Sequence, residues 1–347
     1  MLPAGHRVIV PALGETPLAA LDTATLEPQP APVPGAREVV IAVKSASVGW
    51  VDLIMMAGQY QHVPAPPYTP GLEYAGVVAA VGPEAPFAVG DRVLVDPFLA
   101  GPRSLGAYRA FGGFASYAVA PAEAVLPLPA ALSFDQACNL LGNYETAYHC
   151  LFTRGRLQAG ESVLILGASG ATGLAAVHLA KLLGATVIAA GRNDERLAIV
   201  RAQGADHVLN TSNFATLRDD VKRLTGKGVD VVYDGVGGDI SAVALRTLRF
   251  GGRFLIVGWA ATPGAVNQLP TNLIMMKGVD VLGCPTVIST VNDPTLRPPR
   301  LAQVLAWAVA GQIKPHVSHV FPLAEFKTAM ELKWRGEVVG GCVLHPE

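Results

Sequence analysis

The chain has 347 residues, of which 51% are hydrophobic and 15% are charged, and its formal net charge at pH 7 is -1. This length and composition predict a folded protein of about two domains and exclude an intrinsically disordered chain. The near-neutral charge and the lack of a basic block argue against a nucleic-acid or anionic-membrane partner, so we expect small-molecule ligands.

Cysteine usage and hydropathy point to a reducing, aqueous compartment. The four cysteines, Cys138, Cys150, Cys284 and Cys342, are widely spaced and form no Cys-x-x-Cys pair. They suggest neither a disulfide framework nor a structural zinc site, and we expect reduced thiols. No apolar run reaches about eighteen residues, and residues 1–10 lack the apolar core of a signal peptide. We therefore expect a cytoplasmic protein that does not span a membrane.

The first part of the chain alternates short extended runs with turns that are rich in glycine and proline. The clearest runs are Glu38–Lys44, Ala75–Val81 and Asp91–Asp96. This rhythm is typical of a β-rich domain, which we assign to residues 1–133.

From Phe134 the pattern changes to alternating strands and helices. Six runs predict strands: Ser162–Leu166, Thr186–Ala190, His207–Leu209, Val229–Asp234, Arg253–Val257 and Val279–Leu282. The helices predicted between them include Asp194–Ala202, Leu217–Leu224 and Ile240–Leu248, closed by Gly204, Gly226 and Gly251. This alternation predicts an α/β domain with a doubly wound, parallel six-stranded sheet over residues 134–285.

The last part of the chain, residues 286–347, has too few elements for a core of its own. After a helical pattern at Arg300–Ala310, it predicts a strand at Val317–Phe321, a helix at Leu323–Trp334 and a strand at Val338–Leu344. We expect this segment to fold back onto the first domain, and we expect ligands to bind in a cleft between the two domains.

A glycine-rich turn follows the first strand of the predicted α/β domain. It comprises Gly167, Ala168, Ser169, Gly170, Ala171, Thr172 and Gly173. Gly170 would let the backbone approach a pyrophosphate, and Gly173 would let the following helix, Leu174–Leu183, pack closely against the sheet. That helix would offer its first amides to the anion, and His178 with Lys181 would form its polar edge. A second strand ends about twenty residues later, so we favour a dinucleotide site over a structural turn.

The end of that second strand favours NADPH over NADH. Gly191 stands where NAD enzymes generally carry an acidic residue, and Arg192 and Arg196 follow it. Guanidinium groups bind phosphate in a fork, which suits the 2′-phosphate of NADPH. Alternatively, these arginines are ordinary helix-start residues that pair with Asp194 or Glu195. We expect two further strand ends to line the cofactor, with the residues Val236, Gly237, Val257 and Gly258.

Several motifs occur in one order along the chain. They are Val51–Tyr60, Tyr68–Gly76, Gly113–Tyr117, Asn143–Tyr148, Asp234–Asp239, Gly251–Gly258 and Pro270–Lys277. In these motifs the chain resembles the zinc-independent, zeta-crystallin-like quinone oxidoreductase branch of the medium-chain dehydrogenase/reductases. The resemblance implies a GroES-like catalytic domain, completed by residues 286–347, and a Rossmann domain. It further implies hydride transfer from the nicotinamide to a quinone, and a homodimer or homotetramer paired through the last strand, Val279–Leu282.

Within this resemblance, the positions that bind zinc in the zinc-dependent relatives carry no ligands. They correspond to Gly49, Leu72 and Gly142, whose side chains cannot bind a metal, and the four-cysteine structural lobe is missing. Because a catalytic zinc needs three protein ligands, we expect a metal-free mechanism.

The resemblance also indicates candidate catalytic residues. Tyr60 would donate a hydrogen bond to the acceptor oxygen or serve equally well as an aromatic wall. Thr146 matches a family residue near the nicotinamide amide and would open a helix, where it could act only as a cap. Gly49 replaces an asparagine of many members, so we expect substrate positioning to differ and name Trp50 as a candidate. Asp52 is expected to make a structural hydrogen bond.

Three functions remain open at this stage. The first is an NADPH-dependent quinone reductase, and the second is an NADPH-dependent double-bond reductase of α,β-unsaturated ketones or aldehydes. The third is a non-catalytic NADPH-binding protein with a structural or RNA-binding role, because a fold does not dictate a function. The near-neutral charge weakens the RNA-binding version.

Overall fold

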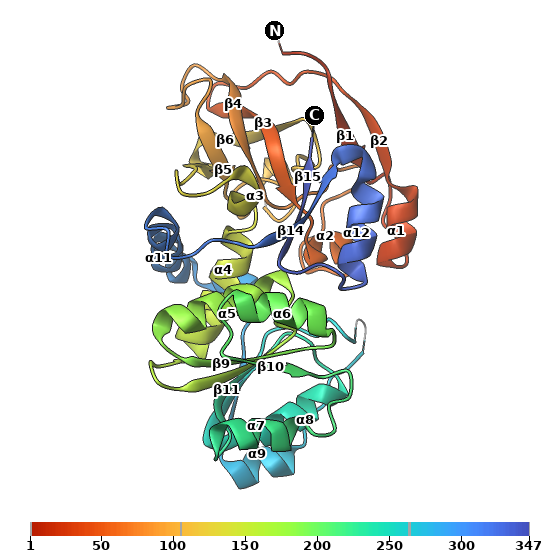
Figure 1. Cartoon of the computed structure of the whole chain (residues 1–347). Helices are drawn as coiled ribbons and strands as arrows, with labels where there is room; N and C mark the ends of the chain where they lie inside the picture. Colours follow the sequence, from red (N-terminus) through yellow and green to blue (C-terminus); the bar gives the residue numbers. More distant parts are fainter. Residues whose placement is uncertain (1, 105, 263–264, 347) are drawn as a thin grey trace. The chain divides into compact units, whose positions relative to one another are not determined.

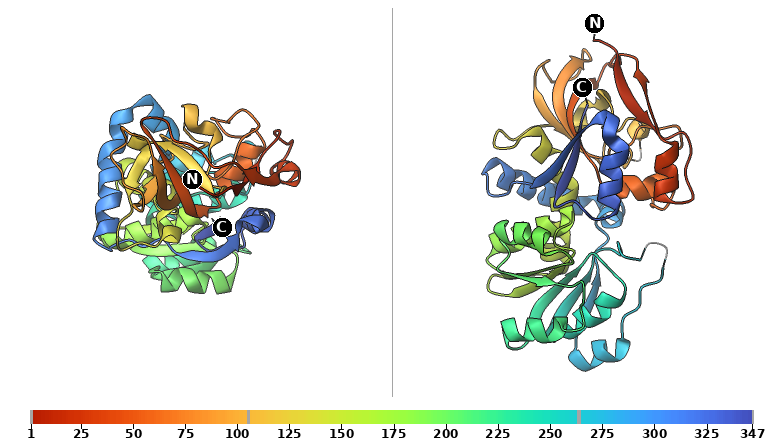
Figure 2. Two further views of the ribbon diagram at one scale, coloured as in Figure 1. Left: turned by 90° about the horizontal axis from the view of Figure 1, so that it is seen from above. Right: turned by 45° about the vertical axis from the view of Figure 1, so that its right-hand side comes forward.

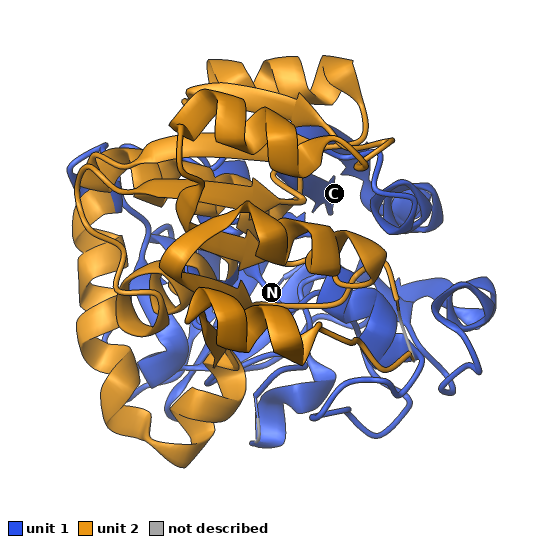
Figure 3. Cartoon of the chain, turned by 90° about the horizontal axis from the view of Figure 1, so that it is seen from below, with its two compact units in different colours: residues 1–142, 308–347 blue, residues 143–307 orange. Residues whose placement is uncertain are grey.

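The structure, a computed structural model, describes residues 2–104, 106–262 and 265–346. The chain divides into two compact units: residues 1–142 with 308–347 form unit 1, and residues 143–307 form unit 2 (Figure 3). These boundaries differ from the predicted ones, since residues 134–142 go with unit 1 and residues 286–307 with unit 2. Asn139 explains the first shift, because its Oδ1 accepts a hydrogen bond from Ser47 Oγ at 2.8 Å.

Unit 1 is built on a seven-stranded sheet of order β14-β15-β3-β4-β5-β7, in which β6 also pairs with β3; a two-stranded sheet joins β1 and β2. Its strands are β1 (Gly5–Ile9), β2 (Thr25–Gln29), β3 (Glu38–Ser47), β4 (Tyr74–Val81), β5 (Arg92–Val95), β6 (Tyr117–Pro121), β7 (Val125–Pro127), β14 (Val317–Pro322) and β15 (Gly341–His345). Its helices are α1 (Pro17–Thr23), α2 (Trp50–Met56), α3 (Phe134–Ala137) and α12 (Phe326–Trp334), with short 3-10 turns at Ala107–Ala110, Ala122–Ala124 and Leu323–Glu325. The β-rich first domain is therefore confirmed.

The end of the chain completes unit 1, as expected. β15 pairs antiparallel with β3, with Val343 opposite Ser47 and Leu344 opposite Ala46, and it lies beside β3 in Figure 1. The helix α12 packs against α1 and α2, which Figure 2 shows from a second side. Leu344 and Met330 are completely buried in the core of unit 1, so this return segment contributes to that core rather than covering it.

Unit 2 contains a six-stranded parallel sheet of order β10-β9-β8-β11-β12-β13. The strands are β8 (Ser162–Leu166), β9 (Thr186–Gly191), β10 (His207–Asn210), β11 (Val229–Asp234), β12 (Leu248–Ile256) and β13 (Asp280–Gly283). The helices are α4 (Leu141–Tyr148, which begins in unit 1), α5 (Ala171–Leu183), α6 (Asp194–Ala202), α7 (Leu217–Thr225), α8 (Asp239–Thr247), α9 (Thr271–Lys277), α10 (Thr286–Asn292) and α11 (Arg297–Val309, which ends in unit 1), with a π-helical turn at His149–Arg154 and a 3-10 turn at Pro294–Leu296. In Figure 1, α5 and α6 cover one face of this sheet, and α7 and α8 cover the other.

The predicted doubly wound sheet is confirmed, but several predicted boundaries need correction. The strand β12 begins at Leu248 rather than Arg253, and the helix α11 begins at Arg297 rather than Arg300. Helix α5 begins at Ala171, three residues before the predicted start, because its N-cap is Gly170. Gly251 does not close α8, since the chain turns directly into β12 at Leu248, whose extended backbone ends the helix. The hydrophobic period identified the helix α8, but no turn residue stands at Thr247 or Leu248, where the helix ends.

A buried ion-pair network joins α4 to α11 in unit 2. Glu145, which is 1% exposed, accepts hydrogen bonds from Arg297 Nη2 at 2.9 Å and from Arg300 Nε at 3.0 Å. The Nη2 of Arg300 also donates to Thr290 Oγ1 at 2.9 Å. This network explains why residues 286–307 belong to unit 2, because buried charges persist only when they are paired.

No helix in the described part of the chain is both long and apolar enough to cross a membrane.

Candidate functional site

The glycine-rich turn lies at the carboxyl end of β8, the central strand of the unit 2 sheet. Gly167 has a φ of +67°, a left-handed conformation that favours glycine. A Cβ added at Gly173 would lie 2.3 Å from the carbonyl oxygen of Gly167, so only glycine fits there. The helix α5 thus packs directly on the turn, and the backbone is kept bare where a ligand would approach.

The first turn of α5 offers hydrogen-bond donors to an anion. The earliest helical bond runs from the amide of Leu174 to the carbonyl of Gly170 at 2.8 Å. Within the described residues, the amides of Ala171, Thr172 and Gly173 have no acceptor. Unpaired amides at a helix N-terminus, with the positive end of the helix dipole, suit a pyrophosphate.

The region predicted to select NADPH over NADH begins at Gly191, at the end of β9. Its carbonyl accepts a hydrogen bond from the amide of Thr211 at 2.7 Å, and a Cβ there would press on Leu197 at 3.1 Å. Arg192 is exposed and forms no ion pair with any described residue. Asp194, the alternative partner, instead accepts a hydrogen bond from Asn210 Nδ2 at 2.7 Å.

Arg196 lies in the first turn of α6, whose N-cap is Asn193. The Oδ1 of Asn193 accepts the amide of Arg196 at 2.9 Å, which fixes the start of the helix. The two arginines therefore flank one cap, and both belong to the segment that directly follows the carboxyl end of β9.

The loop after β11 is shaped by Asp234, a residue that the sequence analysis did not single out. Asp234 is 3% exposed, and its Oδ1 accepts the amides of Val236 at 2.9 Å and Gly237 at 3.0 Å. These two amides are thus used within the protein. Val236 nevertheless lies beside the glycine-rich turn, since its Cγ2 is 3.0 Å from a Cβ built at Gly167.

The segment after β12 is tied to the same loop. The amides of Val257 and Gly258 both donate to the carbonyl of Asp234, at 2.8 and 3.2 Å. Trp259 follows and is 58% exposed, although no sequence pattern indicated it. The structure therefore brings three predicted segments together at one edge of the sheet: the glycine-rich turn, residues 235–237 and residues 257–258.

One prediction about helices near this edge is wrong. Thr146 does not open a helix, since it lies inside α4, and it cannot act as a cap. The predicted polar edge of α5 contacts other elements: the Nδ1 of His178 lies 2.6 Å from the hydroxyl of Tyr144, and its Nε2 lies 3.2 Å from Gln203 Oε1. Lys181 is similarly engaged, with its Nζ 2.8 Å from Asp206 Oδ1. The helical period placed these residues at the edge but could not show which helices pack there.

A hydrogen bond that the sequence analysis missed links α4 to the glycine-rich turn. Thr172 Oγ1 donates to Asn143 Oδ1 at 3.1 Å. Asn143 is the first residue of the Asn143–Tyr148 motif. That motif is the only feature of the sequence that could have indicated this contact.

In unit 1, the candidates Trp50 and Tyr60 lie at and just beyond the two ends of α2. The ring of Trp50 stacks on that of Trp334, with centroids 4.4 Å apart and an interplanar angle of 13°. One face of Trp50 is thus covered by α12. Tyr60 is half-buried and meets His62 edge to face at 6.5 Å. Its hydroxyl forms no hydrogen bond with a described residue, so it remains available as a donor.

Unit 1 also brings Gly49, Leu72 and Gly142, which the resemblance equates with zinc-ligand positions, to two carboxylates. The Oδ2 of Asp52 accepts the amide of Gly49 at 3.0 Å, and its Oδ1 accepts those of Gly71 at 2.9 Å and Leu72 at 3.1 Å. Glu73 accepts the amide of Gly142. Asp52 therefore makes structural hydrogen bonds, and burial raises its pKa to about 7, although these amides favour the carboxylate.

Among the described residues, no three His, Cys, Asp or Glu side chains converge in a way that could hold a metal ion. The four cysteines are buried and unpaired.

Two family models match the chain and divide it as its fold does. Residues 35–130 match the alcohol dehydrogenase GroES-like domain, and residues 171–294 match the zinc-binding dehydrogenase model. A GroES-like β unit and a doubly wound sheet with a glycine-rich turn define a medium-chain dehydrogenase/reductase. The chain belongs to the quinone oxidoreductase branch of this superfamily, a family of oxidoreductases.

Relatives along most of the chain support this assignment. Quinone oxidoreductase-like protein 2 of Bos taurus is 34% identical over 296 residues, which cover 84% of this chain and 80% of the relative. Quinone oxidoreductase of Homo sapiens is 32% identical over 302 residues, 86% of each chain.

Solved structures show the same fold. A probable oxidoreductase from Mycobacterium abscessus has a TM-score of 0.81 at 30% identity and covers 99% of both chains. A mycobacterial protein solved in complex with NADPH has a TM-score of 0.81 at 26% identity, covering 99% of this chain and 100% of its own.

Proposed function

We propose that this protein is an NADPH-dependent, metal-free oxidoreductase that transfers a hydride to a quinone. The observation that carries the proposal is the edge of the unit 2 sheet. There a turn that lacks side chains at Gly167, Gly170 and Gly173 is followed by helix amides without an acceptor among the described residues. The next strand ends without a carboxylate, and its Arg192 forms no ion pair with a described residue. The quinone oxidoreductases among the relatives and the NADPH complex of a mycobacterial neighbour support the same choice.

The residues of unit 2 fit NADPH. The amides of Ala171, Thr172 and Gly173 would hold the pyrophosphate, and Arg192 with Arg196 would hold the 2′-phosphate. Val236, Gly237, Val257 and Gly258 would line the cofactor, with Val236 already beside the turn. When bound, NADPH supplies the hydride from its nicotinamide ring, so the protein has only to orient the reactants and stabilise the charge that develops on the acceptor.

Tyr60 is our candidate for that stabilisation, because its hydroxyl has no partner among the described residues. Replacing Tyr60 with Phe keeps the ring and removes the donor. We expect kcat with a quinone to fall about 10²-fold, as for the loss of one oxyanion-hole donor, with the KM for NADPH nearly unchanged. Steady-state kinetics measure this. Tyr60→Leu is the matched variant, because it removes the ring as well as the donor. If Tyr60→Phe keeps the wild-type kcat and only Tyr60→Leu lowers it, Tyr60 is an aromatic wall.

A substrate panel tests the reaction itself. We expect the purified protein to oxidise NADPH in the presence of quinones, with a higher kcat/KM than for enones or alkenals, followed by the loss of nicotinamide absorbance. NADH serves as the matched cofactor control. A higher kcat/KM with α,β-unsaturated ketones or aldehydes would support the double-bond reductase instead, and the fold accommodates such chemistry, since CurK enoyl reductase shares it at a TM-score of 0.78 and 24% identity. Failure with every acceptor would leave the non-catalytic NADPH-binding role.

We further propose that the protein works as a homo-oligomer in the cytoplasm. The strand β13 ends the order of the unit 2 sheet, and nearby Phe250, Met275 and Met276 are 76, 75 and 65% exposed. An edge strand beside exposed apolar side chains is suited to pairing with a second copy. The four unpaired cysteines fit a reducing compartment. Sedimentation velocity should give a dimer or tetramer, and a monomer at micromolar concentration would contradict this assembly.

A further inference from the structure

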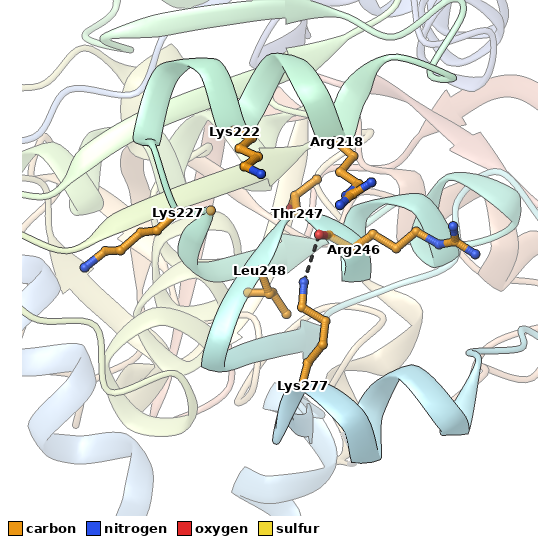
Figure 4. Close-up of a pocket in the computed structure, with 8 residues that line it drawn as sticks. Arg218, Lys222, Lys227, Arg246, Thr247, Leu248 and Lys277 are labelled. Atoms are coloured by element: carbon orange, nitrogen blue, oxygen red, sulfur yellow. Dashed lines mark hydrogen bonds between the residues drawn. The ribbon is translucent and has the colours of Figure 1, made fainter.

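A cluster of positively charged side chains lies in unit 2, away from the glycine-rich turn. Five basic residues, together called the basic hollow, surround a hollow of about 130 Å³ (Figure 4): Arg218, Lys222, Lys227, Arg246 and Lys277. They come from α7, from the turn before β11, from the end of α8 and from the end of α9. This is the amino edge of the parallel sheet, whereas the glycine-rich turn lies at its carboxyl edge.

Three of these cations converge. Figure 4 shows Arg218 and Lys222 directed from α7 towards Lys277, which reaches up from α9. The Nζ of Lys277 donates to the carbonyl oxygen of Arg246 at 2.9 Å. The side chains of Lys227 and Arg246 extend away at the rim.

The basic hollow differs from other charged groups of unit 2 in its lack of ion pairs. Among the described residues, none of its five side chains forms one, although Asp219 and Asp220 adjoin Arg218 in the first turn of α7. Other cations of unit 2 do find carboxylates: Lys181 pairs with Asp206, and Arg253 pairs with Glu161. The chain as a whole has 26 basic and 27 acidic residues, so a general excess of cations does not explain the cluster.

Helix ends account for only part of the arrangement. Lys277 and Lys222 lie in the last turns of α9 and α7, where cations offset the helix dipole. Arg218 lies in the first turn of α7, where the dipole opposes a cation, and it stands four residues from Lys222, so the two like charges repel. Burial and the charge of Arg218 lower the pKa of Lys277. A bound anion would offset the repulsion between these cations.

We propose that the basic hollow binds a phosphate group, either free phosphate or the phosphate of a small monoester. The hollow is smaller than the roughly 300 Å³ at which sites for drug-sized ligands begin, and it matches a single anionic group. A guanidinium fork and two ammonium groups are the donors that recognise phosphate. This site is independent of the proposed reaction, because it lies at the opposite edge of the sheet from the cofactor residues.

Calorimetric titration of the NADPH-saturated protein tests the proposal, since saturation with NADPH keeps phosphate out of the cofactor site. Inorganic phosphate is titrated in one arm and glycerol phosphate in the other, with chloride holding the ionic strength constant. We expect saturable binding of inorganic phosphate at one site per chain. Arg218→Gln with Lys222→Gln should weaken it at least tenfold, without changing NADPH oxidation. Binding of the monoester as well would identify a phosphorylated metabolite as the source, and its absence would identify free phosphate.

A matched control removes two exposed cations elsewhere, Arg201→Gln with Lys314→Gln, and should leave phosphate binding unchanged. If the double variant of the basic hollow fails to fold, Lys222→Gln alone provides the test, because that side chain is exposed. The proposal is overturned if phosphate does not bind saturably or if the control weakens binding equally. It is also overturned if a short RNA binds far more tightly than either phosphate and loses binding in the same variant, since the hollow would then be part of a polyanion surface.

Discussion

Replacing Arg192 and Arg196 together with Ala is expected to raise the KM for NADPH about 10²-fold and to change the KM for NADH less than about twofold. Both cofactors share the pyrophosphate that the α5 amides would hold, and they differ only in the 2′-phosphate. A charge-assisted hydrogen bond contributes about 1.5–3 kcal/mol, so losing the two guanidinium groups affects only the phosphorylated cofactor. Steady-state kinetics and fluorescence titration of both cofactors measure the effect.

The matched control for this pair is Arg201→Ala, at the other end of α6. Arg201 is exposed and lies in the last turn of the helix, so its loss removes a charge without touching the strand end. We expect it to leave both KM values unchanged. Equal increases for NADPH and NADH in the double variant would contradict the 2′-phosphate assignment and would leave the arginines as ordinary helix-start residues.

Replacing Glu145 with Gln is expected to lower the free energy of unfolding of unit 2 by about 3–5 kcal/mol. Glu145 is the carboxylate shared by Arg297 and Arg300, and all three are buried. Glutamine keeps the shape but removes the negative charge that these two buried guanidinium groups share. Hydrogen exchange of the β8 and β11 amides measures the change, because core amides open with the global unfolding of their unit.

An exposed ion pair in the same unit provides the control. Arg156 and Asp280 lie 3.2 Å apart, with side chains 61 and 57% exposed. Asp280→Asn should change the stability of unit 2 by less than about 1 kcal/mol, because solvent screens such pairs. If Glu145→Gln lowers the free energy of unfolding of unit 2 no more than Asp280→Asn does, the ion-pair network does not hold α11 against α4.

The parts of the fold that follow from local patterns could be predicted from the sequence. The strands β8 and β11 and the helix α6 have the bounds that their apolar periods indicate, because each period reports which face is buried. The glycine-rich turn was equally accessible, since Gly173 must lack a side chain wherever a helix packs so closely on a strand end.

Features that depend on contacts between distant segments could not be predicted. His178 sits on a polar stripe of α5, but only the packing of α4 and α6 turns it towards Tyr144 and Gln203. The stacking of Trp50 on Trp334 joins residues that lie far apart in the chain. The basic hollow could not be predicted either, because its cations are spread over about sixty residues of the sequence. They come together only because three helices return to the same edge of the sheet.

The carboxylates of Asp52 and Glu73 bear on how this protein could change in evolution. A Cβ at Gly49 would lie 2.8 Å from Asp52 Oδ2, and a Cβ at Gly142 would lie 2.7 Å from Glu73 Oε1. A side chain at either position would therefore have to displace an acidic side chain that now accepts a backbone amide there. The two carboxylates thus occupy the space that a longer side chain at Gly49 or Gly142 would need.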